Sequence, residues 1–288
     1  MLHSRRLMAV EQNRAVVVSV EQFYPGVPLS HRHGAKRDAK KLHKTLSRLG
    51  FKVQLHNDLS SDEIYELFWK ESRRPVKDCF LAVLSSHGEE GCVFGADGEP
   101  VQLSRIFSYF GNKCMENKAK MFLIQACRGH ALDNGVEVDS VCDTVDSSSS
   151  QCLSVPIDTA VMFPPSSPSG YGAFMHPLGS VFLQTFCTLL QEDGHRDLEL
   201  TRLMTRLSHQ VAYTFQAKGR ELGGKKQMPC LVTSLTREVF PFADPEKDVR
   251  NVEISAAFPP EKDVGKVGIS ATKLVEKGNA RTRTPSIS

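Results

Sequence analysis

Residues 121–129 read MFLIQACRG, a short apolar run that passes directly into a polar turn containing a cysteine. Such a run is typical of a strand that is buried on both faces of a parallel sheet. The same pattern occurs earlier, where CFLAVLSS at 79–86 leads into SHGEEG at 86–91. Because the carboxyl ends of parallel strands meet at one edge of a sheet, we expect these two polar turns to face each other.

Strands and helices alternate outward from these two runs. Apolar or alternating stretches predict further strands at 15–20, at 51–55 and from Cys230, and Asp97-Gly98 predicts a tight hairpin turn. Helical periodicity or capping residues predict helices over 36–49, from the capping box of Ser60 and Glu63, and over 181–190 and 198–215. This order favours an α/β fold with a mostly parallel sheet and helices on both faces.

Composition narrows the class of protein. The 288 residues are 40% hydrophobic and 24% charged, and the net charge of +3 is too small to favour a nucleic-acid or membrane partner. No apolar run reaches about 18 residues and the start lacks a secretory signal, which predicts a cytoplasmic protein. The eight cysteines include no CxxC pair, and no Cys/His cluster has zinc spacing, so we expect neither a metal nor another cofactor.

Two polar segments interrupt the alternating pattern. Residues 140–154 are rich in serine and poor in apolar residues, which predicts an exposed linker. In the tail at 243–288, PEKDVRNVEISA at 245–256 recurs 15 residues later as PEKDVGKVGISA, with nine of twelve positions identical. Each copy has too few apolar residues to form a core, so we expect a disordered tail. Residues 1–13 form a short N-terminal segment.

The two polar turns carry the residue types of a cysteine protease. Cys127 follows one predicted strand, and His87 follows the other, 40 residues earlier. An imidazole beside a thiol can act as its base or stabilise the thiolate, and can later protonate the leaving amine. The backbone N–H groups of Gly88 and Cys127 are candidates to stabilise the oxyanion. Taken singly, such a cysteine is usually a small buried hydrophobe and such a histidine a solvated loop residue.

Together these motifs resemble the caspase family, and most closely its executioner group, over residues 14–242. The resemblance also rests on Arg32-His33-Gly34, Asn57-Asp58-Leu59, Phe94-Gly95 and Lys226-Gln227-Met228-Pro229-Cys230. It implies a three-layer sandwich around a six-stranded sheet and an endopeptidase that cleaves proteins after aspartate, with an executioner role in apoptosis. It further implies a zymogen that is cut into a large subunit (14–139) and a small subunit (155–242), with two such pairs forming a homodimer.

The resemblance also assigns the substrate pocket. Arg32 and Gln125 match two family residues that hold the aspartate, and a guanidinium suits a carboxylate because its hydrogen bonds are charge-assisted. The family has Ser-Trp-Arg on the substrate loop, where this chain has Ala173-Phe174-Met175. The second pocket arginine is therefore replaced by Met175, while Phe174 still offers an apolar wall. Upstream, prolines within residues 161–168 are poorly tolerated by a central strand, so we expect this side of the cleft to be altered.

The linker region contains two sequences that resemble executioner cleavage sites. VEVD ends at Asp139 and DTVD ends at Asp146, and each is followed by serine. Their place at the predicted subunit boundary favours maturation by proteolysis. Self-cleavage and cleavage by an upstream caspase both fit this pattern.

Three functions compete at this stage. The first, which we favour because Cys127, His87, Gly88, Gln125 and Arg32 are all present, is an active endopeptidase that cleaves after aspartate. The second is a caspase-like protein with an impaired cleft, which regulates active caspases by dimerising with them or titrating them. The third is a nucleic-acid or scaffold binder that uses the basic helix and the tail, and it is disfavoured because no aromatic residues interleave with the basic run.

Overall fold

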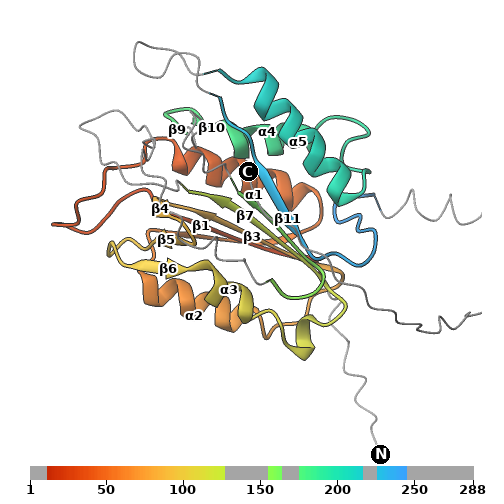
Figure 1. Cartoon of the computed structure of the whole chain (residues 1–288), viewed down its shortest axis with the longest axis horizontal. Coiled ribbons are helices and arrows are strands. Elements are labelled where there is room, and N and C mark those ends of the chain that lie inside the picture. Colours follow the sequence, from red (N-terminus) through yellow and green to blue (C-terminus); the bar gives the residue numbers. More distant parts are fainter. Residues whose placement is uncertain (1–11, 127–154, 164–174, 217–225, 245–288) are drawn as a thin grey trace, which may run out of the picture. The chain divides into compact units, whose positions relative to one another are not determined.

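The central element of the computed structural model is a six-stranded sheet with the order β11-β8-β7-β3-β1-β2 (Figure 1). The structure describes residues 12–126, 155–163, 175–216 and 226–244. The strands of this sheet are β1 (Arg14–Ser19), β2 (Lys52–Asn57), β3 (Cys79–Ser85), β7 (Ala119–Gln125), β8 (Thr159–Phe163) and β11 (Cys230–Thr233). All neighbours are parallel except β11 and β8, so the mostly parallel α/β sheet predicted from the sequence is confirmed.

Helices cover both faces of the sheet and complete the predicted three-layer sandwich (Figure 1). One face carries α1 (Ala35–Arg48), α4 (Val181–Leu189) and α5 (Leu200–Thr214), and the other carries α2 (Ser61–Glu71) and α3 (Leu103–Ser108). A short 3-10 helix, η1 (Lys113–Met115), precedes β7. Each face buries its own apolar core, and alternate residues of the central strands contribute to the two cores in turn.

Local sequence signals explain where several elements begin and turn. The predicted capping box is present: the Glu63 amide donates to the Ser60 hydroxyl, while the Glu63 carboxylate accepts from the Ser60 amide. The predicted hairpin at Asp97-Gly98 joins β5 (Cys92–Phe94) to β6 (Pro100–Gln102) in a small antiparallel sheet that also includes β4 (Gly88–Glu89). The short elements α3, η1 and β4 were not predicted from the sequence, and neither was the pair β9 (Met175–His176) and β10 (Gly179–Ser180).

The proline-containing stretch that follows β8 in sequence does not prevent this central strand from forming. β8 pairs with β7 from Thr159 to Met162 and with β11 from Ala160 to Phe163. It ends at the residue before Pro164, and proline cannot donate to a ladder. The strand therefore forms normally up to the prolines, and residues 164–174 lie outside the described part of the chain.

Polar contacts join α1 to the segment that contains β10 and α4. The Asp38 carboxylate accepts from the Ser180 amide at 2.8 Å and from the Gln184 side chain at 2.6 Å. Burial raises the pKa of Asp38, and these hydrogen bonds oppose that effect. The Lys41 ammonium donates to the Gln184 carbonyl at 3.1 Å. These contacts, which we call the α1–α4 seam, tie the part of the chain before residue 127 to the part after residue 154.

The chain divides into two units, Met1–Pro245 and Glu246–Ser288. All the described residues belong to the first unit, and the predicted tail repeat lies outside them. None of the helices in the described part of the chain is long and apolar enough to span a membrane.

Candidate active site

The carboxyl ends of three central strands meet in one row, as the sequence predicted. Ser19 at the end of β1 lies opposite Ser85 at the end of β3, which in turn lies opposite Gln125 at the end of β7. The Ser86 amide then donates to the Gln125 carbonyl at 3.1 Å. The turn that carries His87 therefore leaves the sheet directly beside the point where the chain runs on from β7 toward residue 127.

His87 is held by the loop that follows β1. Its Nε2 lies 2.9 Å from the Ser30 carbonyl oxygen, so a neutral imidazole that donates this hydrogen bond carries its proton on Nε2. The Phe23 ring stacks on the imidazole, with centroids 5.4 Å apart. Burial and the nearby Arg32 charge lower the pKa of His87 to about 4, although the hydrogen bond to Ser30 works against this. The imidazole is therefore neutral at pH 7, with Nδ1 left as a proton acceptor.

The predicted oxyanion donor Gly88 lies on β4, where the ladder directs its amide outward. Phe94 donates its N–H to the His87 carbonyl at 2.8 Å, so these two residues form a hydrogen-bonded pair. In an antiparallel ladder such pairs alternate with non-hydrogen-bonded ones, and Gly88 opposite Val93 is the next pair along. The Gly88 N–H consequently points away from β5, as an oxyanion donor requires.

Arg32 is 3% exposed, and its guanidinium lies at the same strand ends. One nitrogen donates to the Val20 carbonyl at 2.6 Å and another donates to the Ser85 hydroxyl at 3.0 Å. Burying a charged side chain is costly unless its hydrogen bonds are satisfied, and these contacts fix the guanidinium at the end of β3. Burial distinguishes Arg32 from the basic residues at the start of α1, since Lys36 and Arg37 are exposed.

Gln125 completes the row as a buried amide. Its side chain is 2% exposed, and its Oε1 has no hydrogen-bond partner in the described structure. Buried polar atoms without a partner are uncommon and require an explanation. A ligand group that enters between the strand ends offers one, because the amide lies in the same row as the Ser85 hydroxyl that holds Arg32.

Comparison with known proteins decides the family. A family model described as the caspase domain matches residues 12–240. The chain belongs to the caspase family. It is 35% identical to Caspase-3 of Mesocricetus auratus over 238 residues, which cover 80% of this chain and 84% of that protein. It is 33% identical to Caspase-7 of Gallus gallus over 237 residues, 79% of this chain and 76% of that protein.

Several predicted site residues of this caspase chain lie outside the described residues. These are the nucleophile Cys127, the pocket wall Phe174 and the processing sites Asp139 and Asp146. Met175, which occupies the place of the family arginine, is described: it begins β9, pairs with Ser180 of β10 and is half-buried. The described residues that the structure does bring together are His87, Gly88, Arg32 and Gln125.

Two residues that contact His87, the predicted catalytic histidine, were not predicted from the sequence. Ser30 acts through its backbone carbonyl, which no side-chain pattern reveals. Phe23 lies in the long loop between β1 and α1. An aromatic side chain directly after the polar Glu21 and Gln22 was the one sequence feature that could have indicated a contact there. Both residues contact the imidazole itself, Ser30 through a hydrogen bond to Nε2 and Phe23 by stacking on the ring.

Proposed function

We propose that this caspase is a cysteine endopeptidase that cleaves proteins after aspartate and acts in an executioner-like role in apoptosis. The observation that carries the proposal is the shared strand edge at which His87, Gly88, Arg32 and Gln125 gather. A base, an oxyanion donor and a cation for the aspartate carboxylate are needed within one cleft, and this edge supplies all three.

Acylation follows from the state of His87. Because Nε2–H donates to Ser30, Nδ1 accepts the proton of the Cys127 thiol as the sulfur attacks the scissile carbonyl carbon. The carbonyl oxygen becomes an oxyanion, to which the Gly88 and Cys127 N–H groups donate. The imidazolium then gives its proton to the leaving amine nitrogen, the C–N bond breaks and a thioester remains on Cys127.

In deacylation His87 again acts first as the base and then as the acid. A water molecule gives a proton to His87 Nδ1 and its oxygen attacks the thioester carbonyl carbon. The second oxyanion collapses, the C–S bond breaks and the proton on Nδ1 returns to the sulfur. The products are the regenerated thiol and a carboxylic acid on the aspartate residue, which becomes a carboxylate by releasing its proton to water.

Maturation and assembly are also part of the proposal. Cleavage after Asp139 or Asp146 would separate a large part, 14–139, from a small part, 155–242, by self-cleavage or by an upstream caspase. β11 supports a homodimer, because it is the edge strand of the sheet and exposes Cys230 while Leu231 and Val232 are half-buried. An apolar edge strand of this kind is a surface for pairing with a second chain. A cytoplasmic location stays a prediction from the sequence.

One observation favours a second candidate function. A half-buried methionine begins β9 where the family has a pocket arginine, so the carboxylate of a substrate aspartate has lost one cationic partner. A charge-assisted hydrogen bond is worth about 1.5–3 kcal/mol, or roughly ten- to a hundredfold in specificity. The second candidate is therefore a caspase-like regulator that dimerises with active caspases or titrates them.

The test is hydrolysis of a tetrapeptide reporter that ends in aspartate. Purified chain that has been cut in the linker should hydrolyse the reporter, and Cys127→Ala should abolish hydrolysis because it removes the nucleophile. Circular dichroism and thermal unfolding of both proteins establish that they share one fold. If the cut wild type is as inactive as Cys127→Ala, the enzyme proposal fails and the regulatory function takes its place.

A further inference from the structure

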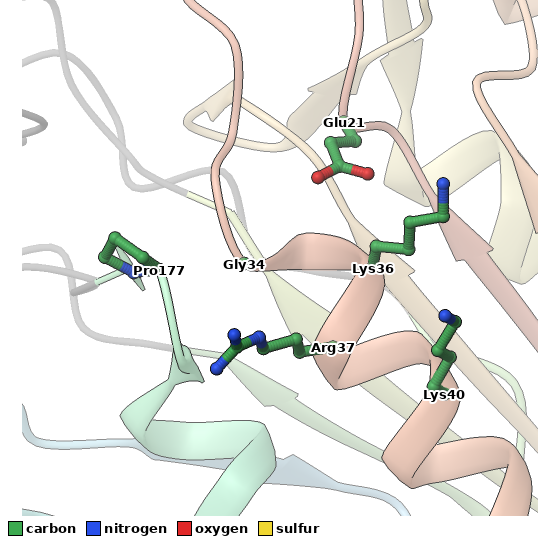
Figure 2. A pocket seen from close by; sticks show the side chains of 6 residues that line it. All are labelled: Glu21, Gly34, Lys36, Arg37, Lys40 and Pro177. Atoms are coloured by element: carbon green, nitrogen blue, oxygen red, sulfur yellow. The ribbon is translucent and has the colours of Figure 1, made fainter.

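An open hollow lies at the start of α1, beside the turn between β9 and β10 (Figure 2). Its volume is about 290 Å³. The residues that line it are Glu21, Gly34, Lys36, Arg37, Lys40 and Pro177. Figure 2 shows Lys36 and Lys40 rising from one side of α1, while Arg37 extends from the helix toward the segment that carries Pro177.

The hollow has an excess of positive charge that the described residues leave unpaired. Lys36, Arg37 and Lys40 are exposed, and none of them forms an ion pair within the described part of the chain. The acid on the same helix, Asp38, is buried in the α1–α4 seam. Glu21 is the one acid among the six lining residues, so cations exceed acids by two.

The same residues repel one another along the helix. Lys36 and Lys40 are four positions apart, and Arg37 and Lys40 are three apart, so like charges are neighbours on the helix surface. Such pairs destabilise a helix rather than support it. A role in folding therefore does not explain this cluster, whereas binding of an anion would relieve the repulsion.

We propose that this hollow binds an acidic segment of a partner protein in an extended conformation. Four residues of α-helix advance about 6 Å, which separates Lys36 from Lys40. Two residues of an extended chain advance about 6.6 Å. A segment with a carboxylate at every second position therefore places one carboxylate against each lysine, with Arg37 available to a third.

The lining residues argue against other anions. Glu21 opposes a compact phosphate dianion, whose two charges cannot be separated, more than it opposes a segment whose carboxylates are spread along the chain. None of the described residues that line the hollow is aromatic, so they give nucleic-acid bases nothing on which to stack. The open lining of exposed lysine and arginine side chains matches a flexible polypeptide with spread charge.

The hollow adjoins the predicted cleft but needs no catalysis. Gly34 lies two residues after Arg32, whose amide donates to the Glu21 carbonyl at 3.0 Å. Pro177 lies two residues after Met175. The binding of an acidic segment goes beyond the proposed protease activity and holds for an active enzyme and for a regulator alike.

The experiment measures peptide binding to the full chain carrying Cys127→Ala, so that no peptide is cleaved. Fluorescein-labelled peptides with alternating glutamate and glycine are compared with glutamine and glycine peptides by fluorescence anisotropy at low and physiological salt. The glutamate peptide should bind, more weakly as salt rises. The double change Lys36→Gln and Lys40→Gln should weaken its binding about five- to tenfold, as expected for two exposed ion pairs.

The matched control removes two exposed lysines elsewhere, through Lys52→Gln and Lys113→Gln, and should leave binding unchanged. Equal weakening by both double variants would reduce the effect to net charge and overturn the proposal. Lys36→Arg with Lys40→Arg keeps the charges and should bind as the parent does, which excludes a folding defect as the cause. Absence of peptide binding at low salt, or tighter binding of single-stranded DNA or inorganic phosphate than of the peptide, would also overturn it.

Discussion

The predicted cleft has two sides that are held differently. The first side, which carries His87 and Arg32 and precedes the linker in sequence, is held by the central sheet. The second side, the β9–β10 pair that follows the linker, contacts the start of α1. His87 and Arg32 are held by hydrogen bonds to Ser30, Val20 and Ser85, next to the ends of β1 and β3. The β9–β10 pair has two residues in each strand and is not part of the central sheet. It contacts α1 at Gly34 and Asp38.

This difference shows which part of a protease cleft tolerates change. The predicted base and oxyanion donor follow β3, whose residues up to Leu84 belong to the apolar cores, where substitutions are costly. The described part of the second side, the β9–β10 pair, lies outside the central sheet and contacts α1 and α4, so we expect a substitution at Met175 to leave the fold intact. The predicted departure from the family pattern, a methionine at 175 in place of arginine, accordingly lies on the side that contains β9 and β10.

Gly34→Ala should break the contact between the two sides and has the largest expected effect. Gly34 has φ +102°, and an added Cβ would lie 2.1 Å from the His176 carbonyl oxygen. Left-handed backbone costs an alanine about 1–2 kcal/mol, and the clash with backbone adds to this. We expect a loss of about 3 kcal/mol in the free energy of unfolding, measured by urea denaturation.

Gly50→Ala is the matched control at the other end of α1. Gly50 also has a positive φ, +80°, but an added Cβ would meet nothing within 4 Å. It should therefore lose only the backbone cost of about 1–2 kcal/mol. Equal losses in the two variants would mean that the approach of His176 to Gly34 contributes nothing.

Met175→Arg should restore the arginine of the family pattern on the second side of the cleft and so test whether its replacement weakens substrate recognition. A second guanidinium for the substrate aspartate should raise kcat/KM for the tetrapeptide reporter about tenfold, in line with one charge-assisted hydrogen bond. His176→Arg is the neighbouring control, because adjacent side chains of β9 point to opposite faces of the strand. An unchanged kcat/KM in Met175→Arg would instead assign the altered cleft to the proline-containing segment at 164–168.

Phe23→Ala should produce the smallest effect, on the pH dependence of the first side. Without the stacked ring, water reaches the imidazole, so the pKa of His87 should rise from about 4 toward its ordinary value of 6.5. The acid limb of the kcat/KM profile should move to higher pH, because the base must be neutral. Phe23→Leu keeps an apolar cover and should shift the limb less; a limb that stays in place in Phe23→Ala would contradict the assigned role of the ring.

The lowered pKa of His87 also gives stability a defined pH dependence. Between about 4 and 6.5 the unfolded chain binds a proton at this residue and the folded protein does not. The stability that comes from the neutral imidazole is fully present above pH 6.5 and is lost as the pH falls from 6.5 to about 4. In Phe23→Ala the pKa of His87 in the folded protein should be higher, so the pH range over which stability is lost should begin above 4. Urea unfolding across this pH range measures the change.

The sequence predicted the long elements and the strand-edge site, but not the contacts that depend on backbone. β7 agrees with its apolar run and α2 with its capping box, because burial and capping are written in side chains. The common edge at which β3 and β7 end was expected because parallel strands share that edge, and the pairing of Ser85 with Gln125 agrees with it. The Ser30 carbonyl was not accessible in this way, since every residue carries a backbone carbonyl, whereas the Gly88 N–H was among the predicted oxyanion donors.

β7 and β8 are neighbours in the middle of the sheet, and the segment that joins them contains the predicted linker. Each apolar core also combines residues from before and after that segment, such as Leu42 with Phe186 and Phe122 with Val161. A continuous chain keeps the two halves at a high effective concentration while these cores assemble. Cleavage after folding leaves the paired strands and the cores in place. Cleavage before folding would turn an intramolecular step into a bimolecular one, so the yield of native protein would then depend on its concentration.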